Sequence, residues 1–440
     1  MSSRRRPWPQ RAWRRLRGSL WPIPVVGVAL AIGLGVAVPA LDEALGGDTP
    51  FTFVFGGGPS AARDVLAAIA GSLVSVTGLT FSLTVVALQL GSSQYSPRLL
   101  QTFTRDRVVQ VTLAQLVLTF VYALTVLRTV RTQDDESGTS AFVPRLSVTL
   151  AYLLTLGSVV ALLLFLGHLA RSLRVETMLR DVHDEAMSTF DEEVGSGPAR
   201  PVPALPTGPP SALPARSSGF VVHVDEARIV AAATRCDAVV VLVPRIGDGV
   251  VAGVPVAHTW LPDGADAGQL QEALDAGVEL DFERHADRDL GYGLRTTVDV
   301  VSRALSSGIN DPTTAVHGLG HVSALLGDLA HRSLGPASYT DDGGRLRLVV
   351  PQWSYADLLE VALEEPVQYA EGSPAVLRRL AALLREVAWR APAGVADEAL
   401  RHWWGRLEVV AARTSDLPAA VVEQWRTDLE DALAEHWAPR

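Results

Sequence analysis

The sequence contains no lysine, and all 38 basic residues of the 440-residue chain are arginines. This absence excludes Schiff-base catalysis by lysine, the phosphate-binding lysine of P-loop proteins and the catalytic lysine of protein kinases. It also excludes a biotin or lipoyl carrier, since both groups are attached to lysine. An arginine-only composition is typical of a GC-rich genome, because lysine codons are rich in adenine.

Cysteine and charge are scarce as well. The single cysteine, Cys236, excludes an intrachain disulfide and a zinc site built from cysteines. Only 20% of the residues are charged, against about 25% in soluble proteins, and 48% are hydrophobic. The mean hydropathy is +0.22 and the net charge is -10. These values argue against a purely soluble, disordered or nucleic-acid-binding protein, and the length allows roughly two to three domains.

Common catalytic motifs are also missing. The sequence has no Gly-x-Ser-x-Gly nucleophile elbow, and no Gly-x-Gly-x-x-Gly follows a strand-like segment. We therefore expect no enzymatic activity and assign no cofactor.

Four apolar stretches are each long enough to cross a bilayer, for which about 20 residues are needed. They cover residues 20–41, 65–97, 108–127 and 146–169. A cleaved signal peptide is the competing interpretation of the first stretch, but its apolar core is too long and three more stretches follow. The sequence predicts a membrane domain of four transmembrane helices.

Arginine is distributed unevenly around these stretches. Seven arginines precede the first, three more lie between the second and third, and others follow the fourth. Positive residues are retained on the cytoplasmic side of membrane proteins. We therefore predict a bacterial inner-membrane protein with both termini in the cytoplasm. The arginines of the second loop are predicted to line a cytoplasmic mouth: Arg98, Arg105 and Arg107.

The second stretch is unusual because residues 65–97 carry no charge over 33 positions. As a helix it would be about 50 Å long, well beyond the ~30 Å hydrocarbon core. Small and polar residues recur on one helical face: Gly71, Ser75, Gly78, Ser82 and Gln89. Three threonines fall on another face: Thr77, Thr80 and Thr84. The polar stripe is compatible with close helix packing and with a pore lining, and both readings stay open.

The remainder of the chain is predicted to form a cytoplasmic α+β domain with a small β module and a C-terminal helical region. We divide the chain into a basic cytoplasmic N-terminus (1–19), a four-helix transmembrane domain with a helical extension (20–193), a Pro-rich linker (194–218), a small β module (219–265) and a mainly helical region (266–440). A barrel is one arrangement that stays open for the β module. In the last region we predict helices over 268–276, 291–306, 312–331, 355–369, 373–390, 395–413 and 418–436, with a hairpin at 345–350.

The best local motif in that region lies at residues 299–315. It reads as one helix ending near Ser306, Gly308 as its C-terminal cap, Asn310 or Asp311 as the next N-cap, and Pro312 at the first helical position. A capped helix–helix corner explains most of these residues. Because a helix N-terminus also binds anions, a ligand site that includes Arg303 stays open.

Two histidines on the following helix, His317 and His321, have a spacing that could bind a metal. Packed or surface histidines are commoner, and the glutamate of the metalloprotease signature is missing beside His317. We therefore predict no metal site.

Two segments resemble an uncharacterised family of bacterial integral membrane proteins, the domain of unknown function twenty-two fifty-four. They are Phe81-Ser-Leu-Thr-Val-Val-Ala-Leu-Gln-Leu-Gly-Ser-Ser-Gln-Tyr-Ser-Pro-Arg-Leu-Leu100 with the following 103–107, and Arg303-Ala-Leu-Ser-Ser-Gly-Ile-Asn-Asp-Pro-Thr-Thr-Ala315. The sequence departs from the family pattern at Ser307, where proline is usual. The resemblance implies a membrane location and brings no established activity.

From these features we expect an oligomeric inner-membrane channel for ions or small solutes. Its pore would be lined by the second transmembrane helix, and the cytoplasmic domain would assemble or gate it. The alternative is a non-conducting membrane-anchored sensor or scaffold whose cytoplasmic domain binds a ligand or a protein. Expected partners are the lipid bilayer and further copies of the chain, with no nucleic acid; the ion or ligand is not specified by the sequence.

Overall fold

The computed structural model describes residues 21–45, 55–94, 106–131, 142–172, 174–195, 197, 201–262, 264–284 and 288–437, with side chains only up to residue 91 in the second range. The chain forms two compact units, which we call the membrane unit (Ser2–Arg174) and the C-terminal unit (Val175–Arg440). The predicted basic N-terminus, 1–19, lies outside the described residues.

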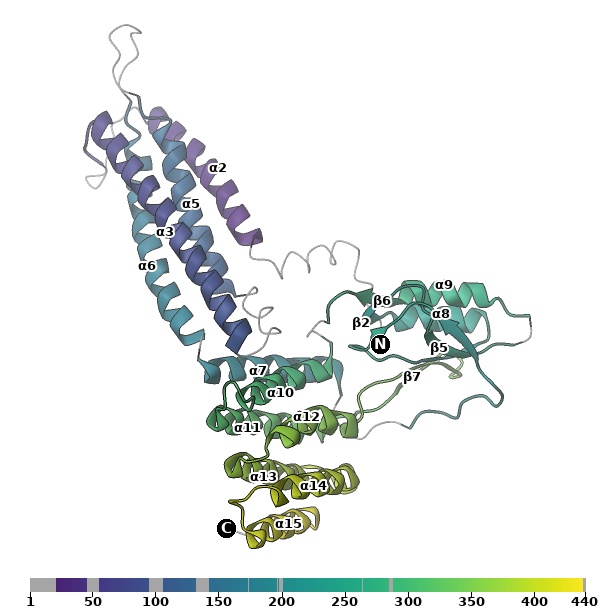
Figure 1. Cartoon of the computed structure of the whole chain (residues 1–440). Helices are drawn as coiled ribbons and strands as arrows, with labels where there is room; N and C mark the ends of the chain where they lie inside the picture. The colour runs from purple at the N-terminus through teal and green to yellow at the C-terminus, as the bar shows by residue number, and fades with distance from the viewer. Residues whose placement is uncertain are drawn as a thin grey trace. The chain divides into compact units, whose positions relative to one another are not determined.

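The membrane unit contains four long apolar helices that run side by side (Figure 1). They are α2 (Pro22–Ala44), α3 (Pro59–Gln94), α5 (Arg107–Leu127) and α6 (Arg145–Ser172). Each is long and apolar enough to cross a membrane, which confirms the prediction of four spans. At 36 residues, α3 is about 54 Å long and exceeds the ~30 Å hydrocarbon core.

Helix α5 lies at the centre of this bundle and packs against α2, α3 and α6. In its most apolar window, 56% of the residues are buried inside the bundle, against 22% in each of the other three helices. The core between the helices includes Leu66, Leu116, Tyr122 and Ala151. The other three helices therefore turn much of their surface away from the chain's own core.

The C-terminal unit contains two small sheets. The first has the strand order β1 (Ser211–Pro214), β5 (Pro255–Trp260), β3 (Val239–Leu242), β8 (Leu346–Val350) and β7 (Ala337–Thr340). Only the β3–β8 pair is parallel, with Val240 beside Leu348. The second is antiparallel, in the order β4 (Gly249–Val250), β2 (Gly219–Val224) and β6 (Val278–Asp281). Helices α8 (Glu226–Arg235) and α9 (Ala267–Gly277) pack together, and both contribute to the apolar core of this region.

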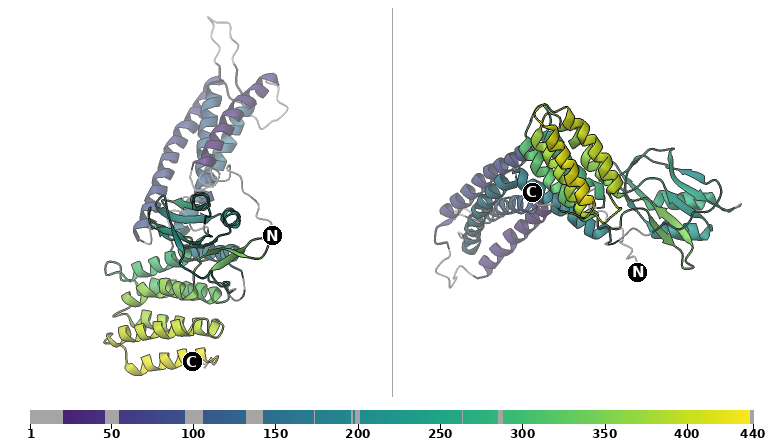
Figure 2. Two further views of the ribbon diagram at one scale, coloured as in Figure 1. Left: turned by 90° about the vertical axis from the view of Figure 1, so that its right-hand side faces the viewer. Right: turned by 90° about the horizontal axis from the view of Figure 1, so that it is seen from below.

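The remaining helices of this unit are stacked in successive layers (Figures 1 and 2). They are α7 (Val175–Glu193), α10 (Leu290–Ala304), α11 (Pro312–Leu329), α12 (Tyr355–Tyr369), α13 (Pro374–Arg390), α14 (Asp397–Ala412) and α15 (Ala419–Leu433). Helices α7, α10 and α11 pack on one another, α11 packs on α13, and α13 packs on α14 and α15. A continuous apolar core runs through all seven.

A polar junction joins the sheets to these helices. The Arg245 guanidinium lies 3.6 Å from the ring centre of Trp353 and 2.8 Å from an Asp357 carboxylate oxygen. Next to it, buried Asp289 pairs with Arg284 and caps α10 through the Gly291 amide. Burial raises the pKa of Asp289, although Arg284 acts in the opposite direction. Gly247 has a φ of 94°, and a side chain there would collide with the Asp289 carboxylate, so this loop position requires glycine.

Three boundaries differ from those drawn on the sequence. Helix α7, placed with the transmembrane domain as residues up to 193, belongs to the C-terminal unit because its apolar face packs on α10 and α11. Strand β1 lies inside the predicted linker, 194–218, because it pairs with β5. The module predicted at 219–265 has neighbours outside those bounds, since β6, β7 and β8 complete its sheets, and these form two open sheets and no barrel among the described residues.

Candidate functional site

The polar stripe of α3 lies on the outer surface of the membrane unit. Its five members are all exposed: Gly71, Ser75, Gly78, Ser82 and Gln89. At about 100° per residue, these positions fall within about 60° of one another around the helix axis. A Cβ placed on Gly71 or Gly78 would meet nothing within 4 Å. The stripe therefore faces lipid or another molecule.

The opposite face of α3 packs against the bundle. Thr80 and Thr84 are buried and Thr77 is half-buried. Each hydroxyl donates to the carbonyl four residues earlier, at 2.6 to 2.8 Å. The buried hydroxyls are thus satisfied within α3 itself, while the apolar residues beside them make the contacts with α5. A pore lined by the polar stripe has to lie outside this bundle, between chains.

The predicted mouth is only partly described. Arg107 is the first residue of α5 and is exposed, whereas Arg98 and Arg105 lie outside the described residues. The residue before Arg107, Asp106, accepts a hydrogen bond from the Val108 amide at 2.8 Å and caps α5.

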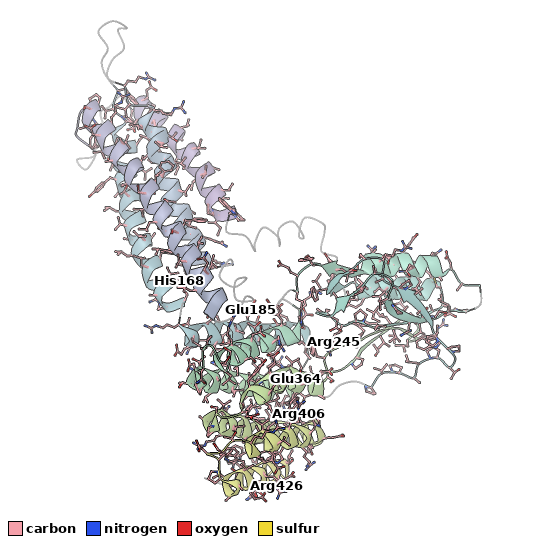
Figure 3. All side chains as sticks on the ribbon, in the orientation of Figure 1. His168, Glu185, Arg245, Glu364, Arg406 and Arg426 are labelled. Atoms are coloured by element: carbon pink, nitrogen blue, oxygen red, sulfur yellow. The ribbon has the colours of Figure 1, made fainter. Side chains whose placement is uncertain are left out.

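His168 lies near the end of α6 (Figure 3). The second oxygen of Asp106 lies 2.5 Å from Nε2 of His168, and Ser172 Oγ is 3.2 Å from the same nitrogen. Asp106 therefore joins the start of α5 to the end of α6. Sequence reasoning did not single out Asp106. An aspartate directly before an uncharged helix is an N-cap signal that was available, but its pairing with a histidine 62 residues away was not.

A cluster of polar side chains joins α5 to α6 inside the bundle. Thr119 Oγ1 and Ser158 Oγ are 2.9 Å apart, and Gln115 Nε2 donates to the Leu154 carbonyl at 3.3 Å. The Tyr122 hydroxyl donates to the Ser147 carbonyl at 3.2 Å. Such bonds between membrane helices fix their register, and each stabilises the packed helices by about 0.6 kcal/mol on average.

The C-terminal motif forms a helix–helix corner, as the sequence predicts. Asp311 is the N-cap of α11 and accepts from the amides of Thr313 and Thr314, and Pro312 takes the first helical position. The hydrogen bond from the Thr314 hydroxyl, together with these amide bonds, holds the pKa of Asp311 below its usual value. Arg303 lies in the last turn of α10.

The cap predicted at Gly308 is wrong. Helix α10 ends at Ala304 with Leu305 as its C-cap, and the left-handed residue of the corner is Asn310, with a φ of 49°, while Gly308 does not adopt a positive φ. Asparagine tolerates this conformation better than other residues with a Cβ. The Asp311 amide donates to the Ala304 carbonyl at 2.8 Å. This bond requires the chain to reverse its direction at Asn310, directly before Asp311.

His317 and His321 both lie on α11, and His321 contacts a third histidine, His183 of α7. In the described part of the chain, no group of three or more His, Cys, Asp or Glu side chains is arranged to hold a metal ion. Cys236 is buried, as expected for a small apolar side chain.

Four membrane-length helices followed by a polar unit of sheets and stacked helices define an integral membrane protein with a large extramembrane part. The chain belongs to the predicted membrane protein family DUF2254, whose model matches residues 17–386. This confirms the resemblance carried by the two motifs.

The chain is also similar to uncharacterized proteins of Mycobacterium bovis (Mb1321c) and Mycobacterium tuberculosis (Rv1290c). Each is 36% identical over 388 residues, which cover 85% of this chain and 72% of the relative. No solved structure matches the chain. Helices α14 and α15 follow the part of the chain that the family model matches.

Proposed function

We propose that several copies of this chain assemble in the bacterial cytoplasmic membrane into a channel that conducts ions or small solutes. The observation that carries this proposal is the exposed polar stripe of α3. The bilayer core is a poor environment for exposed hydroxyl and amide groups. Ser75, Ser82 and Gln89 all point away from their own bundle, so contact with water in a shared pore would relieve the cost of placing them against lipid.

The shape of the bundle supports an assembly. Three of the four helices bury only 22% of their most apolar window, so a single chain encloses little of its α3 surface. Rotational symmetry would place one copy of α3 from each subunit around a common axis. Gly71 and Gly78 have open space above them and would widen the path at two levels.

The charge at the proposed mouth favours anions. With both termini in the cytoplasm, as the arginine distribution indicates, Arg107 would lie at the cytoplasmic entrance together with Arg98 and Arg105. The single acid of this loop, Asp106, is engaged by the Val108 amide and by His168. Its charge is therefore partly balanced, and the arginines would set the local potential.

Ion flux from liposomes that contain the purified full chain tests the proposal. We expect flux in the wild type and its loss in Ser82→Trp, because an indole at this exposed position would fill the path. Leu163→Trp is the matched control, since Leu163 is 65% exposed on α6 and lies away from the stripe. Size-exclusion profiles should show the same assembly for all three proteins.

Two results would overturn the proposal. Absence of flux in the wild type across several ions and voltages would favour the non-conducting sensor or scaffold. Flux that persists in Ser82→Trp with an unchanged assembly would remove α3 from the wall of the pore.

A further inference from the structure

Three of the ten histidines of the chain meet where α7 packs against α11. The ring centres of His183 and His321 are 5.3 Å apart in an edge-to-face arrangement. His317 lies one turn before His321 on α11, and the centres of these two rings are 5.7 Å apart. We call these three residues the histidine cluster.

Helices α7, α10 and α11 pack closely beside the cluster. A Cβ on Gly318, next to His317, would lie 2.6 Å from Val301 of α10 and 4.0 Å from Leu179 of α7. A Cβ on Gly293 of α10 would lie 2.5 Å from Ala186 of α7. Leu179 and Ala186 are one turn to either side of His183, so a movement of α7 away from α10 and α11 would disturb close packing on both sides of this residue.

The ring of His321 suits the neutral form. Among the described residues, Nδ1 of the neighbouring His183 is buried and has no hydrogen-bond partner. A second proton on His321 would place a positive charge in this partly buried contact, with the desolvation cost that this carries.

The surrounding charges do not compensate for added protons. Burial is the main cause that lowers the pKa of His321, followed by His183, His317 and Arg180, and only Asp184 acts in the opposite direction. Two further acids on α7, Asp181 and Glu185, each take part in an interaction as well.

The other helices around α11 add little charge to the cluster. Helix α10 approaches α7 closely at Gly293 and α11 closely at Val301. Its Arg295 pairs with Asp299 and with Glu365 of α12, and its Arg303 also takes part in an interaction. On α13, Glu386 is bound by Ser323 of α11 and by Arg379. On α12, the Tyr355 hydroxyl donates to a backbone carbonyl of α11.

We infer that the histidine cluster is a proton-sensitive contact through His321, which holds α7 against α11 while His321 is neutral and releases α7 when His321 is protonated. A group whose pKa is lowered in the folded state binds fewer protons there than in the released state. The contact is therefore complete above the ordinary histidine pKa of about 6.5 and weakens as pH falls below it. Each proton that binds only in the released state changes the equilibrium between packed and released α7 by up to about tenfold per pH unit.

Helix α7 gives this contact a possible use beyond local stability. It begins at Val175, directly after α6 ends at Ser172, so it is the first element that the chain builds after the fourth span. Release of α7 would alter the segment that is covalently joined to the membrane unit. This inference does not require that the protein conducts.

Amide hydrogen exchange on the full chain in lipid nanodiscs tests the inference. Protection factors, corrected for intrinsic exchange, would be compared for α7 peptides between about pH 7.5 and about pH 5.5, across the ordinary histidine pKa. We expect protection to fall at least about tenfold in the wild type. In the triple variant His183→Gln/His317→Gln/His321→Gln we expect no such change, whereas His402→Gln on α14 should behave like the wild type.

His183→Phe keeps an aromatic edge at the contact and serves if the triple variant does not fold; its pH response should be smaller than that of the wild type. Equal protection of α7 at both pH values in the wild type would overturn the inference. A fall in protection of the same size in a folded triple variant would do so too. Loss of protection at about pH 7.5 on adding EDTA would show that a metal ion, and no proton-sensitive contact, holds the helices.

Discussion

Asp42 shows how one side chain can organise a membrane bundle. It is the last buried residue of α2, and its carboxylate accepts bonds from the Leu146 amide at 2.9 Å, the Ser147 amide at 3.0 Å and the Ser147 hydroxyl at 2.7 Å. These amides belong to the first turn of α6, which has few other partners for them. Asp42 therefore acts as an N-cap for a helix more than one hundred residues away.

Asp42→Ala is expected to destabilise the membrane unit by about 2 kcal/mol, because it removes a cap and leaves buried amides unpaired. The matched control is Glu43→Ala: Glu43 is 64% exposed and lies 4.0 Å from Arg131, so its loss should cost less than about 0.5 kcal/mol. Thermal unfolding of both variants in detergent measures the difference. Equal losses would show that Asp42 contributes only as a charge at the helix end.

At the residue scale, the sequence predicts what depends on near neighbours. Asp311 and Pro312 were predicted as the start of a helix because a cap and its amides lie within three residues. The partners of Asp42 and Asp106 are 105 and 62 residues away, and no local pattern reveals them. The corner at Asn310 lies between these cases: the turn was predictable, but the residue that adopts the positive φ was not.

At the element scale, the four spans were predictable because a long uncharged apolar run is itself the signal. The two polar faces of α3 were also predictable from helical periodicity. Which of them turns inward was not, since Thr80 and Ser82 carry the same hydroxyl chemistry and differ only in what packs beside them. Strand β1 was missed for a related reason: its hydrogen-bond partners are in β5, about forty residues later in the chain.

Glycines decide how closely α2 approaches α5. A Cβ on Gly35 would lie 2.7 Å from Cβ and Cγ2 of Thr125, and Cβ moves only with the backbone. Gly35→Ala should therefore force the helices apart and cost about 1–3 kcal/mol.

Gly33 lies two residues earlier on the same helix, and among the described residues no atom lies within 4 Å of its Cβ position. Gly33→Ala should be neutral or stabilise α2 by up to about 1 kcal/mol through helix propensity. Detergent unfolding midpoints of the two variants provide the comparison. The close packing of α2 on α5 would be contradicted if Gly35→Ala unfolded no earlier than Gly33→Ala.

At the scale of the whole molecule, the exposed surface of α3 leads to a prediction about how subunits assemble. If the polar stripe faces a central path, the residues about 80° to either side of it face the neighbouring copies. Leu79 and Phe81 occupy these positions and are 62% and 48% exposed. Neither belongs to the buried core of a single chain, so their exposed apolar surface is available for packing between subunits.

The double variant Leu79→Ala/Phe81→Ala is therefore expected to weaken assembly at least about tenfold, or about 1.4 kcal/mol, without lowering the unfolding midpoint. The control is Leu163→Ala/Leu164→Ala on α6, where the side chains are 65% and 63% exposed and face away from any proposed contact. Native mass spectrometry of detergent-solubilised protein over a dilution series gives the subunit number and its concentration dependence. Equal dissociation of the two variants would move the subunit contact away from α3, and with it the axis of the proposed pore.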